Sequence, residues 1–217
     1  MPDFSTRRIM MVDTQVRPSD VTKFPIIDAM LTVKREDFVP VAQRETAYMG
    51  ENLDLGEGRV ILDPRTLAKM LDALDIAPDE LVLDVGAAHG YSAAVIAHLA
   101  QAVVALEDND AMAAEAQDAL MSAGMDNVIT HVETLKAGAA EHGPYDVIVV
   151  EGGVTQVPEA LLSQLKDGGR IAALFMDGAL GEVRIGYKID GMMSWRRAFN
   201  AGAPVLPGFE KHDAFTL

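Results

Sequence analysis

The chain has 217 residues, of which 49% are hydrophobic, enough for one sizeable core. Thirty-three acidic against eighteen basic residues give a formal net charge of −15, which disfavours binding to nucleic-acid phosphates and anionic lipids. Cysteine is absent, which excludes disulfides, thiolate metal sites and cysteine nucleophiles. No run approaches the roughly 18 apolar residues of a membrane span, and no signal-peptide core is present, so we expect a soluble, cytoplasmic protein without nucleic-acid or membrane partners.

Residues 20–48 alternate apolar and polar positions at helical spacing, which predicts a helical N-terminal region. Ser19 and Asp20 are candidate helix caps, and Pro25 and Pro40 are expected to interrupt the helices.

A Gly- and Asp-rich segment, 50–64, follows and is too irregular for a helix. Loops of this length are often lids or binding loops. We therefore expect a single domain in which 1–64 form the helical region and lid loop, and 65–217 form an α/β core.

Helix and strand patterns alternate from residue 65 onward. Helices are predicted at 65–76, 91–100, 110–123 and 157–166, and strands at 81–85, 102–107, 127–132, 145–150, 171–176, 183–189 and 192–199. Several strands are apolar without alternation, which indicates burial on both faces and hence a parallel sheet between helix layers. Gly168-Gly169 is expected to end the last helix, and the final strands to form an antiparallel tail. The predicted fold class is α/β, a doubly wound, mostly parallel sheet.

The most informative segment is the end of the first core strand, Asp84-Val-Gly86-Ala87-Ala-His-Gly90. A strand, a tight turn and a helix N-terminus in succession are where α/β proteins hold nucleotide-like ligands. The small residues between Gly86 and Gly90 would let a ligand approach the backbone closely. The glycine spacing is not that of dinucleotide sites.

Acidic residues close the next two strands, at the edge of the sheet where ligands bind. Glu107, with Asp108 beside it, ends the second strand, and a carboxylate there can accept hydrogen bonds from both hydroxyls of a ribose. Glu133, or Thr134 as second choice, could accept from an exocyclic amine such as adenine N6. Asp84 could fix the glycine turn or accept from a ligand ammonium group. The alternative for Glu107 and Glu133 is a solvated surface charge.

Two other chemistries are disfavoured. The histidines are scattered along the chain, and we predict no metal site: His89, His98, His131, His142 and His212. The segment around Ser92 is similar to a nucleophile elbow, but Ala94 replaces its last glycine and only the terminal His212 could complete the triad order.

Together these residues resemble the cofactor site of class I S-adenosylmethionine-dependent methyltransferases, and more specifically the protein-L-isoaspartate O-methyltransferase family. The matching segments cover nearly the whole chain, in order: 30–40, 47–48, 56–64, 82–91, 144–146 and 157–170. The resemblance implies a seven-stranded sheet with a reversed final strand, bound S-adenosyl-L-methionine and a helical N-terminal region that helps to cover the acceptor. It also implies that the cofactor is held by Asp84, Gly86, Ala87, Gly90, Glu107, Asp108, Glu133 and Thr134.

The chain departs from this family in the lid loop. The family usually carries Ser or Thr two residues before the loop proline, near the substrate carboxylate, where this chain has Leu62. Leucine cannot donate a hydrogen bond, and Asp63 would repel a carboxylate unless Arg65 offsets it. Leu62 and Asp63 are therefore the acceptor-loop candidates, Asp63 as a base or positioning group or, alternatively, as the N-cap of the next helix before Pro64.

A second departure lies after the third strand, where Glu133-Thr134 replaces the family's Asp-Gly pair. Three functions remain open on this sequence: methylation of isoaspartyl carboxylates in damaged proteins or peptides, methylation of another acceptor, including a small molecule, and non-catalytic binding of the cofactor. The oligomeric state is left open.

Overall fold

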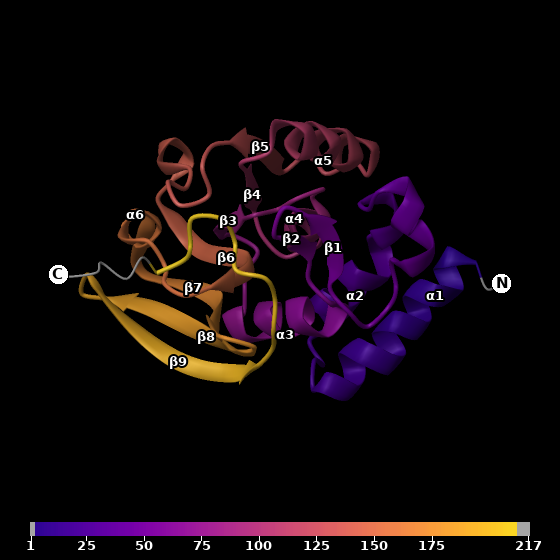
Figure 1. Cartoon of the computed structure of the whole chain (residues 1–217), viewed down its shortest axis with the longest axis horizontal. Helices are drawn as coiled ribbons and strands as arrows, with labels where there is room; N and C mark the ends of the chain where they lie inside the picture. The colour runs from indigo at the N-terminus through magenta and orange to yellow at the C-terminus, as the bar shows by residue number, and fades with distance from the viewer. Residues whose placement is uncertain (1–2, 212–217) are drawn as a thin grey trace.

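The computed structural model describes residues 3–211, which contain a seven-stranded sheet of order β5-β4-β3-β6-β7-β8-β9 (Figure 1). The strands are β3 (Leu81–Val85), β4 (Ala102–Glu107), β5 (Val128–Val132), β6 (Tyr145–Val154), β7 (Leu165–Asp177), β8 (Leu180–Ile189) and β9 (Met192–Asn200). β3 to β7 run parallel, and β8 is antiparallel to both of its neighbours. The predicted fold class and C-terminal hairpin are confirmed, but the reversed strand is β8 and not the final strand.

Side chains of the central strands alternate between two buried clusters, one on each face of the sheet. In β3, Val82 belongs to one cluster and Leu83 to the other, both with no exposed surface. The first cluster also contains the N-terminal region and the helices α3 (Pro64–Leu74), α4 (Tyr91–Ala97) and α5 (Asp110–Ser122). The second contains α6 (Glu159–Leu162) and the C-terminal tail. This burial on both faces explains why the strands lack polar alternation.

The helix predicted at 157–166 is wrong in its second half. α6 ends at Leu162, and Gly168-Gly169 lies inside β7, where the register against β6 shifts. A Cβ on Gly169 would lie 2.9 Å from the carbonyl oxygen of Lys166 and 3.0 Å from that of Asp146. Gly169 therefore permits a close approach of β6 and β7, whereas Gly168 is left-handed with φ 84° and has open space beside it. From sequence alone, such a glycine pair looks the same as a helix stop.

The N-terminal region begins with α1 (Phe4–Met11), a π-helical turn (Val12–Val16) and a 3-10 turn (Arg17–Ser19). α2 (Phe24–Thr32) and two further 3-10 segments (Arg35–Asp37 and Val41–Thr46) follow. Ser19 and Asp20 end the first helical segment and do not cap α2, because Asp20 is left-handed with φ 68° and Lys23 occupies the N-cap. Pro25 lies in the first turn of α2, where its missing N–H costs nothing.

The segment 50–64 is more regular than expected. It contains a two-stranded antiparallel hairpin, β1 (Leu53–Gly56) and β2 (Arg59–Ile61), separate from the main sheet. Glu57 and Gly58 both have positive φ in the connecting turn, as tight hairpin turns require. All three residues of β2 are buried, so the hairpin is docked on the core.

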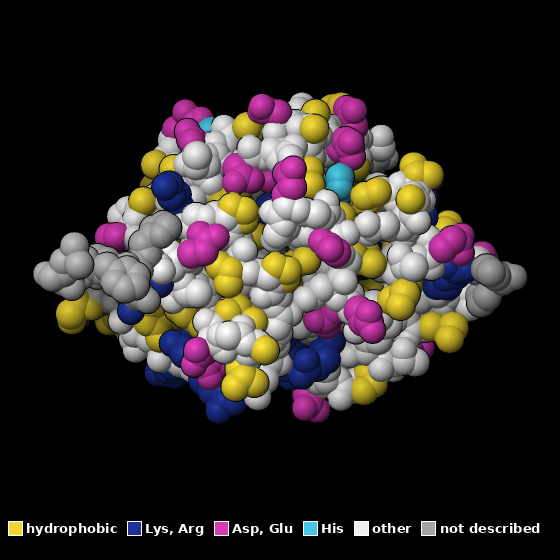
Figure 2. All heavy atoms as spheres, in the orientation of Figure 1, with side chains coloured by type: hydrophobic (Ala, Val, Ile, Leu, Met, Phe, Trp, Pro, Cys, Tyr) yellow, Lys and Arg dark blue, Asp and Glu magenta, His cyan; other side chains and the backbone are white. Residues whose placement is uncertain are grey.

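Acidic side chains are spread over the visible face, whereas Lys and Arg are most numerous low in the view, over the β8–β9 hairpin and α3, with smaller groups near α1 and at the upper left (Figure 2). Within residues 3–211, the helices are too short or too polar to cross a bilayer.

The C-terminal tail crosses the carboxyl ends of the central strands. Gly153 donates to the carbonyl of Pro204 at 2.8 Å and accepts from the amide of Leu206 at 2.9 Å. A Cβ on Gly152 would lie 2.6 Å from Leu206 Cγ, and Leu206 itself has no exposed surface. The two glycines of β6 thus allow the tail to pack directly on the sheet.

Substitution Gly153→Ala should loosen this tail, because its Cβ would lie 2.8 Å and 2.9 Å from the carbonyl oxygens of Ala203 and Pro204. We expect a loss of about 1 to 3 kcal/mol in the free energy of unfolding, measured by denaturant titration. Gly202→Ala is the matched control in the same tail, since no atom lies within 4 Å of its added Cβ. Equal stability of the two variants would contradict the close packing.

Candidate functional site

Three buried carboxylates lie at the carboxyl ends of three adjacent parallel strands. Asp84 is in β3, Glu107 ends β4 and Glu151 is in β6, with exposed fractions of 0%, 0% and 4%. β3 pairs with β4 on one side and β6 on the other, so the three acids share one edge of the sheet. This is the edge where open α/β sheets bind ligands.

The predicted glycine turn lies beside these acids. Gly86 and Gly90 have φ of 82° and 89°, which favour glycine, and Gly90 directly precedes α4. The amides of Gly86 and Ala87 donate to the carbonyl of Leu106 at 2.9 and 3.1 Å, which ties the turn to β4. Ala88 is left-handed although it is not glycine, with φ 49°. The turn and Glu107 are therefore one structural unit.

Glu107 has both carboxylate oxygens engaged. Oε1 accepts from the amides of Asp108 at 3.0 Å and Asn109 at 3.2 Å, and Oε2 accepts from the amide of Ala88 at 2.8 Å. Oε2 also accepts from Nη2 of Arg59 in a buried ion pair. Burial raises the pKa of Glu107, and the charge of Arg59 opposes that rise. Glu107 therefore lies buried at the predicted strand end and is paired with an arginine, and its contact with a ribose stays a prediction.

Arg59 was not among the residues expected here. It is 3% exposed and extends from β2 to the glycine turn, where Nη1 would lie 3.0 Å from a Cβ on Gly86. Within the described chain, its Nε and Nη1 have no hydrogen-bond partner. The sequence predicts a lid or binding loop at 50–64, but this segment has no hydrophobic periodicity that would indicate which of its side chains is buried.

Asp84 and Glu151 each have one buried carboxylate oxygen without a hydrogen-bond partner among the described residues. Oδ2 of Asp84 accepts from Ser92 Oγ at 2.7 Å, whereas its Oδ1 and Oε1 of Glu151 have no partner in residues 3–211. Burial raises the pKa of Asp84 to about 7, and the nearby charge of Glu107 adds to the rise. Burial also raises the pKa of Glu151, and the charge of Asp84 adds to it. Glu151 directly follows the predicted strand 145–150, so the strand-end argument used for Glu107 could have found it.

A second buried arginine, Arg35, is bonded to the segment 50–64 and to the chain just before it. Its Nε donates to the carbonyl of Ala47 at 2.7 Å and its Nη2 to the carbonyl of Leu62 at 2.9 Å. The guanidinium carbon lies 4.5 Å from the centre of the Tyr91 ring, a cation–π contact. Leu62 itself has no exposed surface and belongs to the core.

Asp63 is the N-cap of α3, as the alternative interpretation held. Its Oδ1 accepts from the amide of Thr66 at 3.0 Å, and Pro64 occupies the first turn. The role of Leu62 and Asp63 toward an acceptor stays a prediction.

The remaining cofactor candidates do not join the buried set. Asp108 is exposed and contributes its backbone amide to Glu107. Glu133 and Thr134 are exposed just beyond the end of β5, beside β4, and Glu133 Oε1 accepts from the amide of Thr134 at 2.7 Å. That hydrogen bond lowers the pKa of Glu133. Their contact with an adenine stays a prediction.

The histidines are less scattered than the sequence suggests. His131 Nδ1 and His142 Nε2 each lie 3.4 Å from Oε1 of Glu141, and the two rings are 5.1 Å apart. All three side chains lie outside the buried carboxylate set. His89 lies 3.2 Å from Glu115, and His212 falls outside the described residues.

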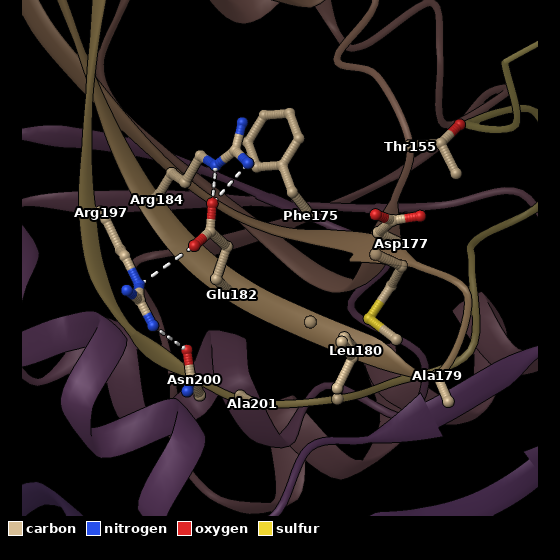
Figure 3. A pocket seen from close by; sticks show the side chains of 13 residues that line it. Thr155, Phe175, Asp177, Ala179, Leu180, Glu182, Arg184, Arg197, Asn200 and Ala201 are labelled. Carbon is tan, nitrogen blue, oxygen red and sulfur yellow. Dashed lines mark hydrogen bonds and ion pairs between the residues drawn. The ribbon is translucent and has the colours of Figure 1, made fainter.

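A cavity of about 710 Å³ lies elsewhere, between the β7–β8 connection and the start of the tail (Figure 3). Figure 3 shows Glu182 between Arg184 and Arg197, and Arg197 reaching Asn200. These charged groups satisfy one another, and none of the predicted site residues lines the cavity. The candidate site is therefore the buried carboxylate set and not this cavity.

The buried set suits a ligand that carries both hydroxyl and cationic groups. Three carboxylates and two guanidinium groups, those of Arg35 and Arg59, sum to a formal charge of −1 when all are ionised. The free oxygens of Asp84 and Glu151 can accept hydrogen bonds from an ammonium group and attract a sulfonium by charge, and Glu107 is an acceptor for hydroxyls. These features fit S-adenosyl-L-methionine.

Substitution Asp84→Asn should reduce the pH dependence of stability. With a pKa near 3.8 unfolded and about 7 folded, Asp84 keeps a proton in the native state that the unfolded chain has released. The free energy of unfolding therefore falls as pH rises through this window, and the variant should lose part of that fall. Denaturant titrations across the window measure it, with the exposed Asp79→Asn as the charge-matched control. If the free energy of unfolding of Asp84→Asn depended on pH as that of the wild type does, the titrating group would be a residue other than Asp84.

Comparison with known proteins identifies relatives over most of the chain. A family model described as Protein-L-isoaspartate(D-aspartate) O-methyltransferase matches residues 9–176. The protein-L-isoaspartate O-methyltransferase of Roseiflexus castenholzii is 37% identical over 169 residues, which cover 78% of this chain and 77% of the relative. That of Methylorubrum extorquens is 37% identical over 171 residues, which cover 79% and 75%.

Solved structures share the fold. A protein-L-isoaspartate O-methyltransferase superposes over 95% of this chain with a TM-score of 0.79 at 24% identity, and this chain spans 66% of that longer protein. A beta-aspartate methyltransferase from Plasmodium falciparum, solved in complex with S-adenosyl-L-homocysteine, superposes over 95% of this chain and 99% of its own with a TM-score of 0.78 at 17% identity.

Proposed function

Because the chain belongs to the protein-L-isoaspartate O-methyltransferase family, we propose that it transfers the methyl group of S-adenosyl-L-methionine to the carboxylate of L-isoaspartyl residues in damaged proteins or peptides. The observation that carries this proposal is the buried Glu107 at the end of β4, bonded to the turn that begins at Gly86. We place the protein in the cytoplasm, with proteins or peptides and not nucleic acid or membranes as partners.

The buried carboxylates would hold the cofactor in a defined orientation. Glu107 would accept from the ribose hydroxyls, and Gly86 would let the ligand approach the backbone. Asp84 and Glu151 would face the cationic amino-acid end of the cofactor, and Glu133 or Thr134 the adenine.

When bound, the cofactor supplies an activated methyl group on a sulfonium. An ionised carboxylate is already a nucleophile, so this chain needs to align the acceptor and exclude water more than to move protons. The β1–β2 hairpin and the tail residue Leu206, both packed against the glycine turn, are the elements that exclude water here.

The acceptor side supports a second candidate, a methyltransferase for another acceptor, including a small molecule. Leu62 is fully buried and Asp63 caps α3, so neither side chain offers a donor to a carboxylate. A protein that binds the cofactor without catalysis is the third candidate, on the same observation.

Calorimetric titration with S-adenosyl-L-methionine and S-adenosyl-L-homocysteine, followed by methyl transfer to an isoaspartyl peptide, separates these candidates. We expect binding and formation of a methyl ester on the isoaspartyl peptide, and none on the same peptide with a normal aspartyl linkage. Binding without turnover would redirect the search to other acceptors. No binding of either nucleoside would overturn the proposal.

Substitution Glu107→Ala should weaken S-adenosyl-L-homocysteine binding, because the ribose loses a charged hydrogen-bond acceptor. We expect a loss of about 1.5 to 3 kcal/mol in binding free energy, measured by calorimetry on protein shown to be folded by circular dichroism. The exposed Glu159→Ala is the charge-matched control and should bind as the wild type does. An unchanged dissociation constant in Glu107→Ala would remove Glu107 from the cofactor site.

A further inference from the structure

Arg59 lies where the cofactor should bind. We infer that Arg59 sets the affinity of the cofactor site by competing with the ribose for the carboxylate of Glu107. This inference rests on the proposed use of S-adenosyl-L-methionine. It adds Arg59 as a residue that determines the affinity for the cofactor.

The position of the guanidinium is the first support. Nη2 of Arg59 is paired with Oε2 of Glu107, and its two terminal nitrogens would lie 3.0 and 3.3 Å from a Cβ on Gly86. The guanidinium therefore fills the space that the missing side chain of Gly86 leaves open. A ribose that bonds to Glu107 beside the same glycine needs that space.

The bonding of Glu107 is the second support. A carboxylate has about four acceptor positions, and all four are used here. Three are taken by backbone amides, those of Ala88, Asp108 and Asn109, which belong to the glycine turn and to the start of α5. The hydrogen bonds from these amides cannot break without a local change of the backbone in the turn or at the start of α5. Arg59 is the side-chain partner of Glu107 in the described chain, so it is the group that a ribose hydroxyl can replace.

Few other polar contacts hold the Arg59 side chain in this position. Its Nε and Nη1 donate to no group that the structure describes, so the Glu107 pair is the main polar contact to be broken. Its strand, β2, pairs with β1 alone, outside the main sheet, and two-stranded hairpins gain little stability by themselves. The hairpin can thus shift without breaking the seven-stranded sheet.

Displacement of Arg59 from Glu107 has a cost, because a buried guanidinium that loses its partner is unfavourable. Arg59 is 3% exposed and paired with Glu107, so a ribose must compete with a buried ion pair for this acceptor position. The balance between the two fixes the cofactor affinity.

The test compares cofactor binding in wild type, Arg59→Ala and Arg59→Met by calorimetry with S-adenosyl-L-homocysteine and S-adenosyl-L-methionine. Arg59→Met keeps much of the side-chain volume without the charge, so it serves if the alanine variant folds poorly. We expect the dissociation constant to fall at least tenfold in the charge-free variants. The exposed Arg44→Ala is the matched control and should bind as the wild type does.

The outcomes separate this inference from the proposed function. Tighter binding in the Arg59 variants supports the competition whether or not isoaspartyl peptides are then methylated. Unchanged or weaker binding in folded variants overturns the competition and leaves the cofactor assignment standing. If neither wild type nor variants bind either nucleoside, the proposed function and the inference both fall.

Discussion

The carboxylate of Glu107 is the interaction on which the site depends. It accepts amides from the turn after β3 and from the start of the helix after β4, and it pairs with an arginine from the β1–β2 hairpin. One buried group therefore fixes three separate segments relative to one another. Burial of such a charge is tolerated because each oxygen is bonded more than once, and charge-assisted hydrogen bonds are the stronger kind.

Much of this region could be predicted from sequence, because local rules govern it. Apolar runs without alternation specified the parallel strands, and the spacing of Gly86 and Gly90 specified the turn. The position of Glu107 then followed from the rule that ligands bind at the carboxyl ends of strands. Glu151 obeys the same rule, because it directly follows the predicted strand 145–150 and is buried at this edge of the sheet.

Other features could not be read from sequence, because they depend on contacts between distant segments. Arg59 meets Gly86 and Glu107 across 27 and 48 positions, and nothing in its own loop marks it as buried. Gly168-Gly169 has the pattern of a helix stop, although it lies within β7, where Gly169 allows the close approach of β6. The sequence allowed two roles for Asp63, acceptor-site group or N-cap of α3, and only the structure shows its hydrogen bond with the amide of Thr66.

The wide separation of the site residues along the chain affects how the protein folds. Arg59, the glycine turn, Glu107, Glu151 and Leu206 come together only when the hairpin, three regions of the sheet edge and the tail are all in place. Contacts of such long sequence separation form slowly and late. The candidate site is therefore a property of the finished fold. A ligand bound there would stabilise the completed native state over partly folded forms, which would make nucleoside binding a reporter of correct folding.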